Sequence, residues 1–370
     1  MTIAISGTSG ITQTGSFDSS STFGFKNRII NGAMVIDQRN AGASVTPTTD
    51  GQYTLDRMQV YISAASKFSV QKDSTVYPTG FTSSAKITSL AATSLAAGDY
   101  YCFLQPIEGF NVADLGFGAS GASTVTISFW VRSSLTGTFG GALRNGAANR
   151  GYPFTYTISS ANTWEQKTIT IAGDTTGTWA TGSTQGMAVI FGLGVGTTNS
   201  GTAGAWAASG YISATGATSV VGTLNATFYI TGVQLEKGST ATSFDYRPYG
   251  TELQLAQRYY FKTLPGAVNV CFAMAYNINT TTAAGLINFP TAMRTAPSAL
   301  EQSGTANQYM IAYLATSTQC TSVPTFSTAS LYGSSVVFTV GAGLTAGQSS
   351  QLRTDGTNGV TAYLAWSAEL

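Results

Sequence analysis

Side chains able to do acid–base chemistry are scarce in this chain of 370 residues, which has no histidine and only 16 aspartates and glutamates. The absence of histidine excludes Ser-His-Asp and Cys-His nucleophile systems, histidine general bases and histidine-bearing zinc sites. A glycosidase would need two carboxylates held roughly 5–10 Å apart across the sugar bond. The carboxylates available for such a pair are Asp37, Asp56, Glu108, Asp114 and Asp245. We interpret them as structural, with Asp56–Arg57 and Asp245 near Arg247 as ion pairs, and predict that the chain is not an enzyme.

The sequence gives little indication of a metal, nucleotide or nucleic-acid site. The three cysteines, Cys102, Cys271 and Cys320, are too widely spaced for a metal site and are predicted to be buried free thiols. The glycine-rich stretch at residues 192–196 is followed by no lysine or helix, so it does not form a phosphate-binding loop. Basic residues do not cluster, and the net charge is +1, so no surface for nucleic acid is visible. We predict no cofactor.

Aromatic side chains are the better candidates for ligand contact, because the apolar C–H face of a sugar stacks on an indole or phenol ring. Trp206 and Tyr211 lie in residues 192–222, a Gly/Ala/Ser/Thr-rich run that buries little by itself. Trp206 either anchors this loop to the body of the protein or is displayed for binding. Tyr152 and Arg150, beside a predicted Gly/Asn-rich turn at residues 140–151, form a second candidate site, and Tyr332 a third.

These residues must be positioned by β-structure. Between residues 28 and 248, period-two alternation and short β-branched or aromatic runs recur, separated by turn-forming clusters. Trp130 lies inside one such run and is predicted to be in the core. The absence of helical periodicity between the runs favours a two-sheet, jelly-roll-like sandwich. The predicted strands are residues 58–62, 68–70, 85–88, 100–105, 125–131, 154–158, 165–171, 187–191 and 228–235.

One short helix is predicted at a junction spanning residues 249–264. Thr251 and Gln254 form a capping-box pattern, and apolar residues follow at helical spacing. Residues 265–370 are predicted to form a smaller C-terminal β-domain, with strands at 268–276, 285–289, 336–340 and 361–370 and with Trp366 in its core. Residues 1–27 are too polar to form a core of their own, so we predict an extended arm for attachment or trimerisation, the alternative being a disordered tail.

Composition bears on location and assembly. No run of 18 apolar residues is present, and the N-terminus has neither the basic nor the apolar region of a secretory signal. We therefore expect assembly in the cytoplasm of the producing cell, with no insertion into a membrane. Only 9% of the residues are charged, and so weakly charged a surface favours self-association. We predict an obligate homo-oligomer.

A series of short motifs resembles the sandwich modules of tail-fibre and other virion proteins of tailed bacteriophages, which are distant relatives of carbohydrate-binding modules. The series covers roughly residues 27–370, each motif being weak alone and the order being the stronger signal. A methionine, Met58, stands where members of the family often have tryptophan. The motifs are NRIINGAMVIDQR (27–39), YTLDR (53–57), QPIEG (105–109), ISFWVRS (127–133), NTWE (162–165), GDTTGTW (173–179), FYITGVQLEKGS (228–239), FDYRPYG (244–250), NFPTAMRTAP (288–297) and SAEL (367–370).

The resemblance implies a non-enzymatic virion protein, commonly a homotrimer, displayed on the tail or capsid and touching host surface glycans. Related carbohydrate-binding sandwiches often hold a structural calcium, but Ala33 and Thr231 stand here where an acid would help, so no metal is predicted. We predict a tail-fibre or receptor-binding protein that adheres multivalently to host glycans and contacts other virion proteins through its N-terminal arm. The alternatives are a capsid-decorating or head-fibre protein, a polysaccharide depolymerase, and a secreted carbohydrate-binding protein.

Overall fold

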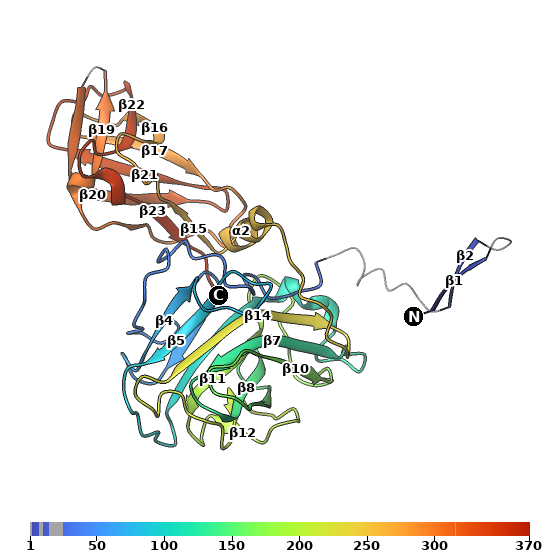
Figure 1. Ribbon diagram of the computed structural model, residues 1–370. Helices are drawn as coiled ribbons and strands as arrows, with labels where there is room; N and C mark the ends of the chain where they lie inside the picture. The colour runs from blue at the N-terminus through green and yellow to red at the C-terminus, as the bar shows by residue number, and fades with distance from the viewer. Residues whose placement is uncertain (1, 7–9, 15–24, 315) are drawn as a thin grey trace.

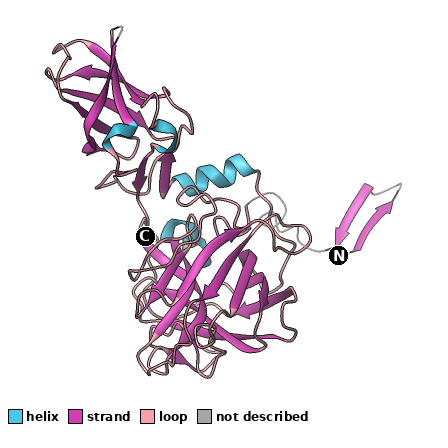
Figure 2. Cartoon of the chain, turned by 60° about the vertical axis from the view of Figure 1, so that its left-hand side comes forward, coloured by secondary structure: helices cyan, strands magenta, loops and turns pink. Residues whose placement is uncertain are grey.

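The computed structural model describes residues 2–6, 10–14, 25–314 and 316–370. Strands dominate it, and the described residues contain a single α-helix (Figures 1 and 2). A β-sandwich occupies the lower part of Figure 1, and a smaller closed barrel lies beyond one end of it. The prediction of an all-β, jelly-roll-like sandwich followed by a smaller β-domain is confirmed.

The first sheet of the sandwich has five strands in the order β10-β7-β14-β5-β4, all antiparallel. The predicted strands at 125–131, 165–171 and 228–235 form its centre and one edge. Between Thr231 and Gln234 the register shifts, and Gly232 adopts φ 61° at that irregularity, a conformation that glycine adopts without strain. The strands are β4 (Phe68–Asp73), β5 (Ser84–Ser89), β7 (Val125–Ser133), β10 (Glu165–Ile171) and β14 (Thr227–Lys237).

The second sheet also has five antiparallel strands, in the order β3-β6-β11-β8-β9. One of its strands overturns the predicted turn at residues 140–151, because β8 runs through Gly140 and Gly141 and only the short segment 146–150 turns. A Cβ on Gly141 would lie 2.3 Å from the Ile190 carbonyl oxygen, so close packing requires glycine there. The strands are β3 (Gln59–Ile62), β6 (Tyr100–Glu108), β8 (Gly137–Asn145), β9 (Gly151–Ile158) and β11 (Gln185–Val195).

The main core lies between these two sheets and is built by alternation along each strand. In β7, Phe129 and Val131 are fully buried and belong to this core. Trp130, between them, points to the opposite face and is only half-buried, so its predicted place in the core is wrong. Period-two alternation sends neighbouring side chains to opposite faces, and here that rule outweighs the hydrophobicity of tryptophan.

The connections beside the sheets range from 3-10 turns to the long segment 196–226 between β11 and β14. After β6 come two 3-10 turns, η1 (Gly109–Asn111) and η2 (Ala113–Leu115). Two two-residue strands, β12 (Ser200–Gly201) and β13 (Ser213–Ala214), pair in parallel. Near the N-terminus, β1 (Thr2–Ser6) and β2 (Gly10–Thr14) form a hairpin, and the other residues of the predicted arm before Phe25 lie outside the described residues.

The single helix, α2 (Tyr249–Gln257), lies between the sandwich and the barrel (Figure 1). It begins two residues earlier than predicted, directly after Pro248, and no side chain caps it. The capping box expected at Thr251 is therefore absent, because Thr251 already lies inside the first turn. Pro248 is the N-cap residue, and its carbonyl accepts the Glu252 amide at 3.0 Å as the first hydrogen bond of the helix.

The barrel closes in the order β16-β17-β21-β20-β19-β22. A separate core of aromatic and aliphatic residues fills it, including Tyr309, Phe338 and the fully buried Trp366, which confirms the expected placement of Trp366. Two 3-10 turns, η3 (Ala306–Gln308) and η4 (Gly359–Thr361), lie in its connections. Its strands are β16 (Cys271–Asn277), β17 (Thr282–Asn288), β19 (Tyr309–Tyr313), β20 (Thr316–Ala329), β21 (Gly333–Val340) and β22 (Ser349–Thr354).

A three-stranded sheet joins the barrel to the sandwich. It has the order β15-β23-β18, with β15 (Tyr260–Thr263), β18 (Glu301–Gln302) and β23 (Leu364–Ser367). The chain thus leaves α2 as a strand of this sheet and comes back from the barrel on the strand next to it. After β23 the last residues return to the sandwich, and the C-terminus lies at the junction in Figure 1.

Candidate functional site

A groove of about 270 Å³ lies on the outer face of the second sheet. Three strand residues form its floor: Tyr61 on β3, Tyr100 on β6 and Arg144 on β8. Alternation places them there, because their chain neighbours Val60, Tyr101 and Leu143 are buried in the sandwich core. The other lining residues come from loops and are Asp50, Asn199, Gly210 and Ile212.

The polar groups of the groove are held by one another. Arg144 Nη2 donates to the Tyr61 hydroxyl at 2.9 Å, and the guanidinium carbon lies 5.1 Å from the centre of the same ring. Across the groove, the Tyr100 hydroxyl donates to Asp50 Oδ2 at 3.4 Å, and Asp50 Oδ1 accepts the Ile62 amide at 2.8 Å. Partial burial raises the pKa of both tyrosines, so both hydroxyls stay protonated at neutral pH. The site offers two phenol rings, a cation and a carboxylate.

One wall of the groove is the loop at residues 196–222, which lies directly on the sheet. The close approach depends on two glycines: a Cβ on Gly140 or on Gly192 would lie within 2.7 Å of the Ser213 hydroxyl. Ile212 packs on the apolar outer side chains of β6 and β11, and its amide donates to the Asn199 carbonyl at 3.0 Å. Asn199 Nδ2 in turn donates to the Gly98 carbonyl at 2.9 Å. The loop covers part of the sheet face, and the groove is the part left open.

Trp206 holds this loop from its other side. Its indole N–H donates to the Ala172 carbonyl at 2.7 Å. The ring lies edge-on to Tyr152, Trp179 and Phe117, with centroid distances of 5.3, 5.5 and 5.8 Å. Of the two roles the sequence left open for Trp206, this geometry is that of an anchor.

The other predicted site residues divide into three places. Tyr152 packs edge-on against Trp206. Arg150 is paired with Asp174, to which its Nε and Nη2 donate at 2.7 and 2.8 Å. Burial acts to raise the pKa of Asp174, but the hydrogen bonds from Arg150 and Thr176 outweigh it, and the pKa is lowered. Tyr211 lies between the groove residues Gly210 and Ile212, and its ring packs against Gly201. Tyr332 is 68% exposed on the barrel, before β21, and shares no site with the others.

Sequence reasoning missed Tyr61, Tyr100 and Arg144. A signal for the tyrosines was present, because adjacent residues of a strand face opposite sides. In the pair Tyr100-Tyr101, one ring therefore had to leave the core. No comparable signal existed for Arg144, since its strand was taken for a turn.

The contacts of the five candidate carboxylates differ in part from those predicted from the sequence. Two predicted ion pairs are wrong: Arg57 pairs with Glu369 rather than Asp56, and Arg247 pairs with Glu252 rather than Asp245. Each of the five carboxylates is engaged in structural contacts. Asp37 accepts the amides of Asn40 and Gly42, Asp56 is held by Gln38, Glu108 by Arg258 and Tyr259, Asp114 by Arg28, and Asp245 by the amides of Lys26 and Asn27.

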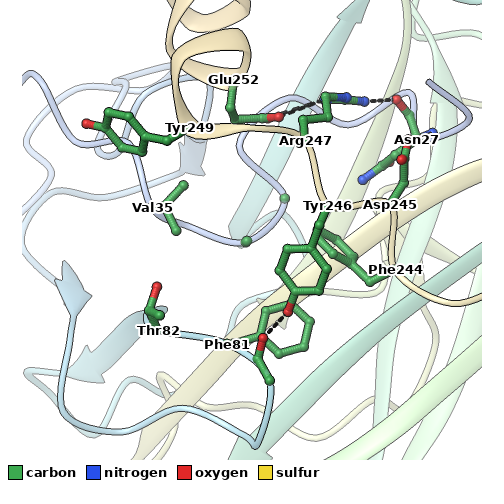
Figure 3. A pocket seen from close by; sticks show the side chains of 13 residues that line it. Asn27, Val35, Phe81, Thr82, Phe244, Asp245, Tyr246, Arg247, Tyr249 and Glu252 are labelled. Carbon is green, nitrogen blue, oxygen red and sulfur yellow. Dashed lines mark hydrogen bonds and ion pairs between the residues drawn. The ribbon is translucent and has the colours of Figure 1, made fainter. Parts of the chain in front are cut away.

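A second hollow, of about 280 Å³, lies where the chain from Phe25 joins the sandwich (Figure 3). Three rings, Phe81, Phe244 and Tyr246, pack on one another beside it with centroid distances of 4.8–5.4 Å. The carboxylate of Asp245 is engaged with the backbone, and Arg247 reaches Glu252 at 3.1 Å and the Asn27 carbonyl. These contacts fasten the root of the N-terminal arm to the sandwich.

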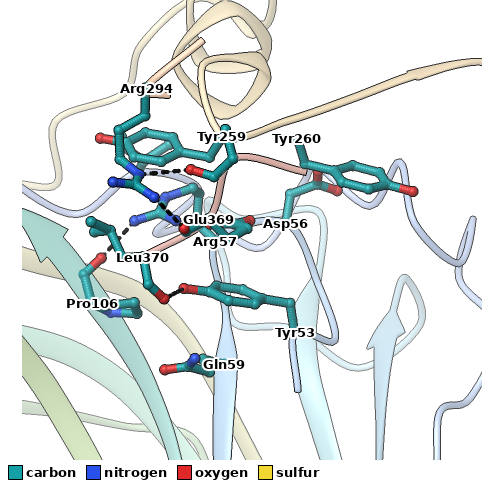
Figure 4. A network of polar contacts seen from close by, with 12 residues as sticks. Tyr53, Asp56, Arg57, Gln59, Pro106, Tyr259, Tyr260, Arg294, Glu369 and Leu370 are labelled. Carbon is teal, nitrogen blue, oxygen red and sulfur yellow. Dashed lines mark hydrogen bonds and ion pairs between the residues drawn. The ribbon is translucent and has the colours of Figure 1, made fainter. Parts of the chain in front are cut away.

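A buried polar network joins the sandwich to the chain returning from the barrel (Figure 4). Arg57 pairs with Glu369, donates to the Pro106 carbonyl at 2.6 Å, and lies 3.6 Å from the centre of the Tyr259 ring. The Tyr53 hydroxyl donates to the Leu370 carbonyl at 3.0 Å. The side chains come from the sandwich, from the helix junction and from the chain end, so this network is an interdomain contact.

The structure also bears on the expectations for the cysteines, for metal sites and for membrane-spanning helices. Cys102 and Cys320 are buried free thiols as predicted, but Cys271 is exposed at the start of β16, so its predicted burial is wrong. Within the described ranges, no group of three or more His, Cys, Asp or Glu side chains is placed to hold a metal ion. Nor does the described part of the chain contain a helix long and apolar enough to cross a bilayer.

No protein-family model and no curated protein matches the chain. Among solved structures, the enzymatically active domain of tailspike protein 4 of bacteriophage CBA120 is 13% identical, with a TM-score of 0.29, over 57% of this chain and 21% of that one. The present chain therefore spans about a fifth of the tailspike domain.

Two further similar structures match along their whole length. A putative sugar binding protein from Bacteroides thetaiotaomicron is 10% identical, with a TM-score of 0.34, over 58% of this chain and 100% of that one. A family 11 carbohydrate-binding module from Clostridium thermocellum, in complex with a β-1,3-1,4-mixed-linked tetrasaccharide, is 10% identical, with a TM-score of 0.29, over 55% and 100%. TM-scores this low do not establish a shared fold. We assign the sandwich from the strand pairings described above.

Proposed function

We propose that this protein is a bacteriophage virion protein of the tail-fibre or receptor-binding type, which adheres to host surface glycans through the groove on its second sheet. The observation that carries the proposal is the groove itself, where the rings of Tyr61 and Tyr100 lie beside Arg144, Asp50 and Asn199. Phenol rings accept the apolar face of a sugar, and the polar groups fix its hydroxyls. The ordered sequence motifs supply the virion part of the proposal.

The groove is small and open, which suits a weak single contact. Its 270 Å³ is just below the usual range of about 300–1,000 Å³ for small-molecule sites, so it has room for one or two sugar units. A receptor-binding protein gains avidity by repeating such a site, because the second contact forms at a high effective concentration. We therefore propose a homotrimer displayed on the tail or capsid, consistent with the low charge of the chain.

The proposed role is adhesive and not catalytic, since each candidate carboxylate is engaged in structural contacts. A polysaccharide depolymerase would release reducing sugars from host glycan, and we expect none. A capsid-decorating protein would be lost from heads rather than tails when residues 1–27 are deleted, and we expect the loss from tails.

The test is binding of the full-length protein to a glycan array and to host cells, with its native mass measured by light scattering. We expect a mass near three times 38.3 kDa and loss of binding in Tyr61→Ala and Tyr100→Ala. Tyr77→Ala is the matched control, because Tyr77 is an exposed tyrosine outside the groove. A protein that binds no glycan, or whose binding survives both groove substitutions, contradicts the proposed site.

A further inference from the structure

Arg144 differs from most arginines of this protein in its partners. Six arginines form ion pairs with Asp or Glu: Arg28, Arg39, Arg57, Arg150, Arg247 and Arg258. Arg144 forms none with the described residues, and its one side-chain hydrogen bond goes to a neutral group, the Tyr61 hydroxyl. A guanidinium carries five N–H donors, so most of the donors of Arg144 have no acceptor among the residues that the structure describes.

Beyond the Tyr61 hydroxyl, the described part of the groove lacks a hydrogen-bond acceptor for the guanidinium of Arg144. Among the described residues, Arg144 Nε is buried without a hydrogen-bond partner, as are the Nε atoms of five other arginines, so what distinguishes Arg144 from most of them is that its charge has no carboxylate partner. The groove's carboxylate, Asp50, is in the opposite situation: both of its oxygens already accept hydrogen bonds, and it is exposed to water. A ligand therefore gains more by bringing an acceptor to Arg144 than by bringing a donor to Asp50.

The planar geometry of the Arg144 guanidinium favours a particular kind of acceptor. The planar guanidinium fork matches a carboxylate, and charge-assisted hydrogen bonds are roughly twice as strong as neutral ones. Because Tyr61 accepts from Arg144, its own hydroxyl hydrogen is free to donate to the same ligand. A second ring, Tyr100, lines the same groove and is available for the apolar face of a sugar.

We infer that the groove binds a carboxylated saccharide, such as a uronic or nonulosonic acid, with its carboxylate on Arg144 and its ring against Tyr61 or Tyr100. The inference rests on the proposed glycan-binding function and specifies its ligand class. Asp50 repels such a ligand, but its exposure to solvent screens that repulsion. Removing the charge of Asp50 therefore strengthens binding of the acid by a small factor.

The experiment measures binding of the full-length protein to matched pairs of probes: oligogalacturonate against its methyl ester, and sialyllactose against lactose. We expect at least one acid to bind roughly tenfold more tightly than its neutral partner, as one charge-assisted bidentate contact implies. Arg144→Gln abolishes that preference, Arg144→Lys keeps part of it, and Asp50→Asn enhances it. Arg132→Gln is the control, because Arg132 lies on the other sheet and also lacks an ion pair among the described residues.

Two other outcomes separate this inference from the function on which it rests. If neutral glycans on the array bind as well as acidic ones and Arg144→Gln changes neither, the ligand class is wrong and glycan binding stands. If no glycan on the array binds, both proposals fail. Circular dichroism and thermal unfolding of each variant verify the fold, and Arg144→Lys keeps the charge should Arg144→Gln be unstable.

Discussion

Arg57 and Glu369 form an ion pair although they stand 312 positions apart in the sequence. Both side chains are almost fully buried, at 1% and 5% exposure. Arg57 belongs to the sandwich, whereas Glu369 follows the last strand of the sheet beside the barrel. Removing one partner from a buried pair leaves the other charge without compensation, and this pair therefore links the stability of the junction to a single carboxylate.

Glu369→Gln is expected to lower the free energy of unfolding by about 3–5 kcal/mol, because it leaves the buried guanidinium of Arg57 unpaired. Denaturant unfolding followed by tryptophan fluorescence measures the change. The comparison variant is Arg28→Gln, which breaks an exposed pair with Asp114 and should cost less than about 1 kcal/mol. Equal losses in the two variants would show that the buried pair contributes no more than a surface pair.

Asp56 gives the stability a specific pH dependence. Burial raises its pKa from 3.8 to about 6, against the opposing effects of Arg39 and Gln38. Below pH 3.8 the group is protonated in both folded and unfolded states. Between pH 3.8 and about 6 the folded state keeps a proton that the unfolded state releases, so this contribution to stability falls as pH rises. Above about pH 6 the full cost, roughly 3 kcal/mol, is present.

Asp56→Asn isolates this effect, because asparagine does not titrate. The unfolding free energy of the variant minus that of the wild type is expected to increase between pH 4 and 6 and then level off. Other carboxylates, such as Glu108 with its lowered pKa, titrate in both proteins and cancel in the difference. A difference that is constant with pH would mean that Asp56 is ionised at pH 4 in the folded protein.

Gly141→Ala is expected to destabilise the second sheet by about 1–3 kcal/mol, the usual cost of overpacking. The added Cβ would lie 2.3 Å from the Ile190 carbonyl and 2.6 Å from the Phe154 ring. Gly182→Ala is the control, because nothing lies within 4 Å of a Cβ there. Thermal unfolding distinguishes the two variants, and equal melting temperatures would contradict the close packing of β8.

Trp206→Ala is expected to release the loop at residues 196–222 and to weaken glycan binding without touching the groove floor. The loss of its hydrogen bond to Ala172 and its three aromatic contacts should raise hydrogen exchange in that loop. Trp206→Phe, which keeps a ring, should restore most of the protection. Unchanged exchange in Trp206→Ala would show that the loop is held by other contacts.

The fold was largely readable from the sequence, because the alternation of buried and exposed residues in β10 and the β-branched and aromatic runs of β7 and β14 are local properties. Two of the strands that were missed lack this signal. β8 carries Gly140 and Gly141, which favour a turn locally, and β20 is a Thr/Ser-rich strand with only Cys320, Val323 and Phe326 among larger apolar residues. Both segments form strands because of the neighbouring strands with which they pair, and a local sequence pattern does not reveal those partners.

The candidate site was less accessible to sequence reasoning. Trp206 attracted attention as a large aromatic in a small-residue loop, and its contacts place it behind the loop rather than in the groove. Arg144 enters the groove only because β8 lies beside β11. Likewise, nothing local indicated that Arg57 would pair with Glu369 in preference to the adjacent Asp56. Partner choice between distant residues depends on topology.

The return of the chain to the sandwich has a mechanical consequence. The barrel is attached at two points, through the segment from α2 into β15 and through the residues after β23 that carry Glu369. A domain attached through a single chain segment can rotate about that segment, and any force on the domain acts on this one connection. With two adjacent attachments, a force on the barrel is divided between them. Each attachment also resists rotation of the barrel about the other.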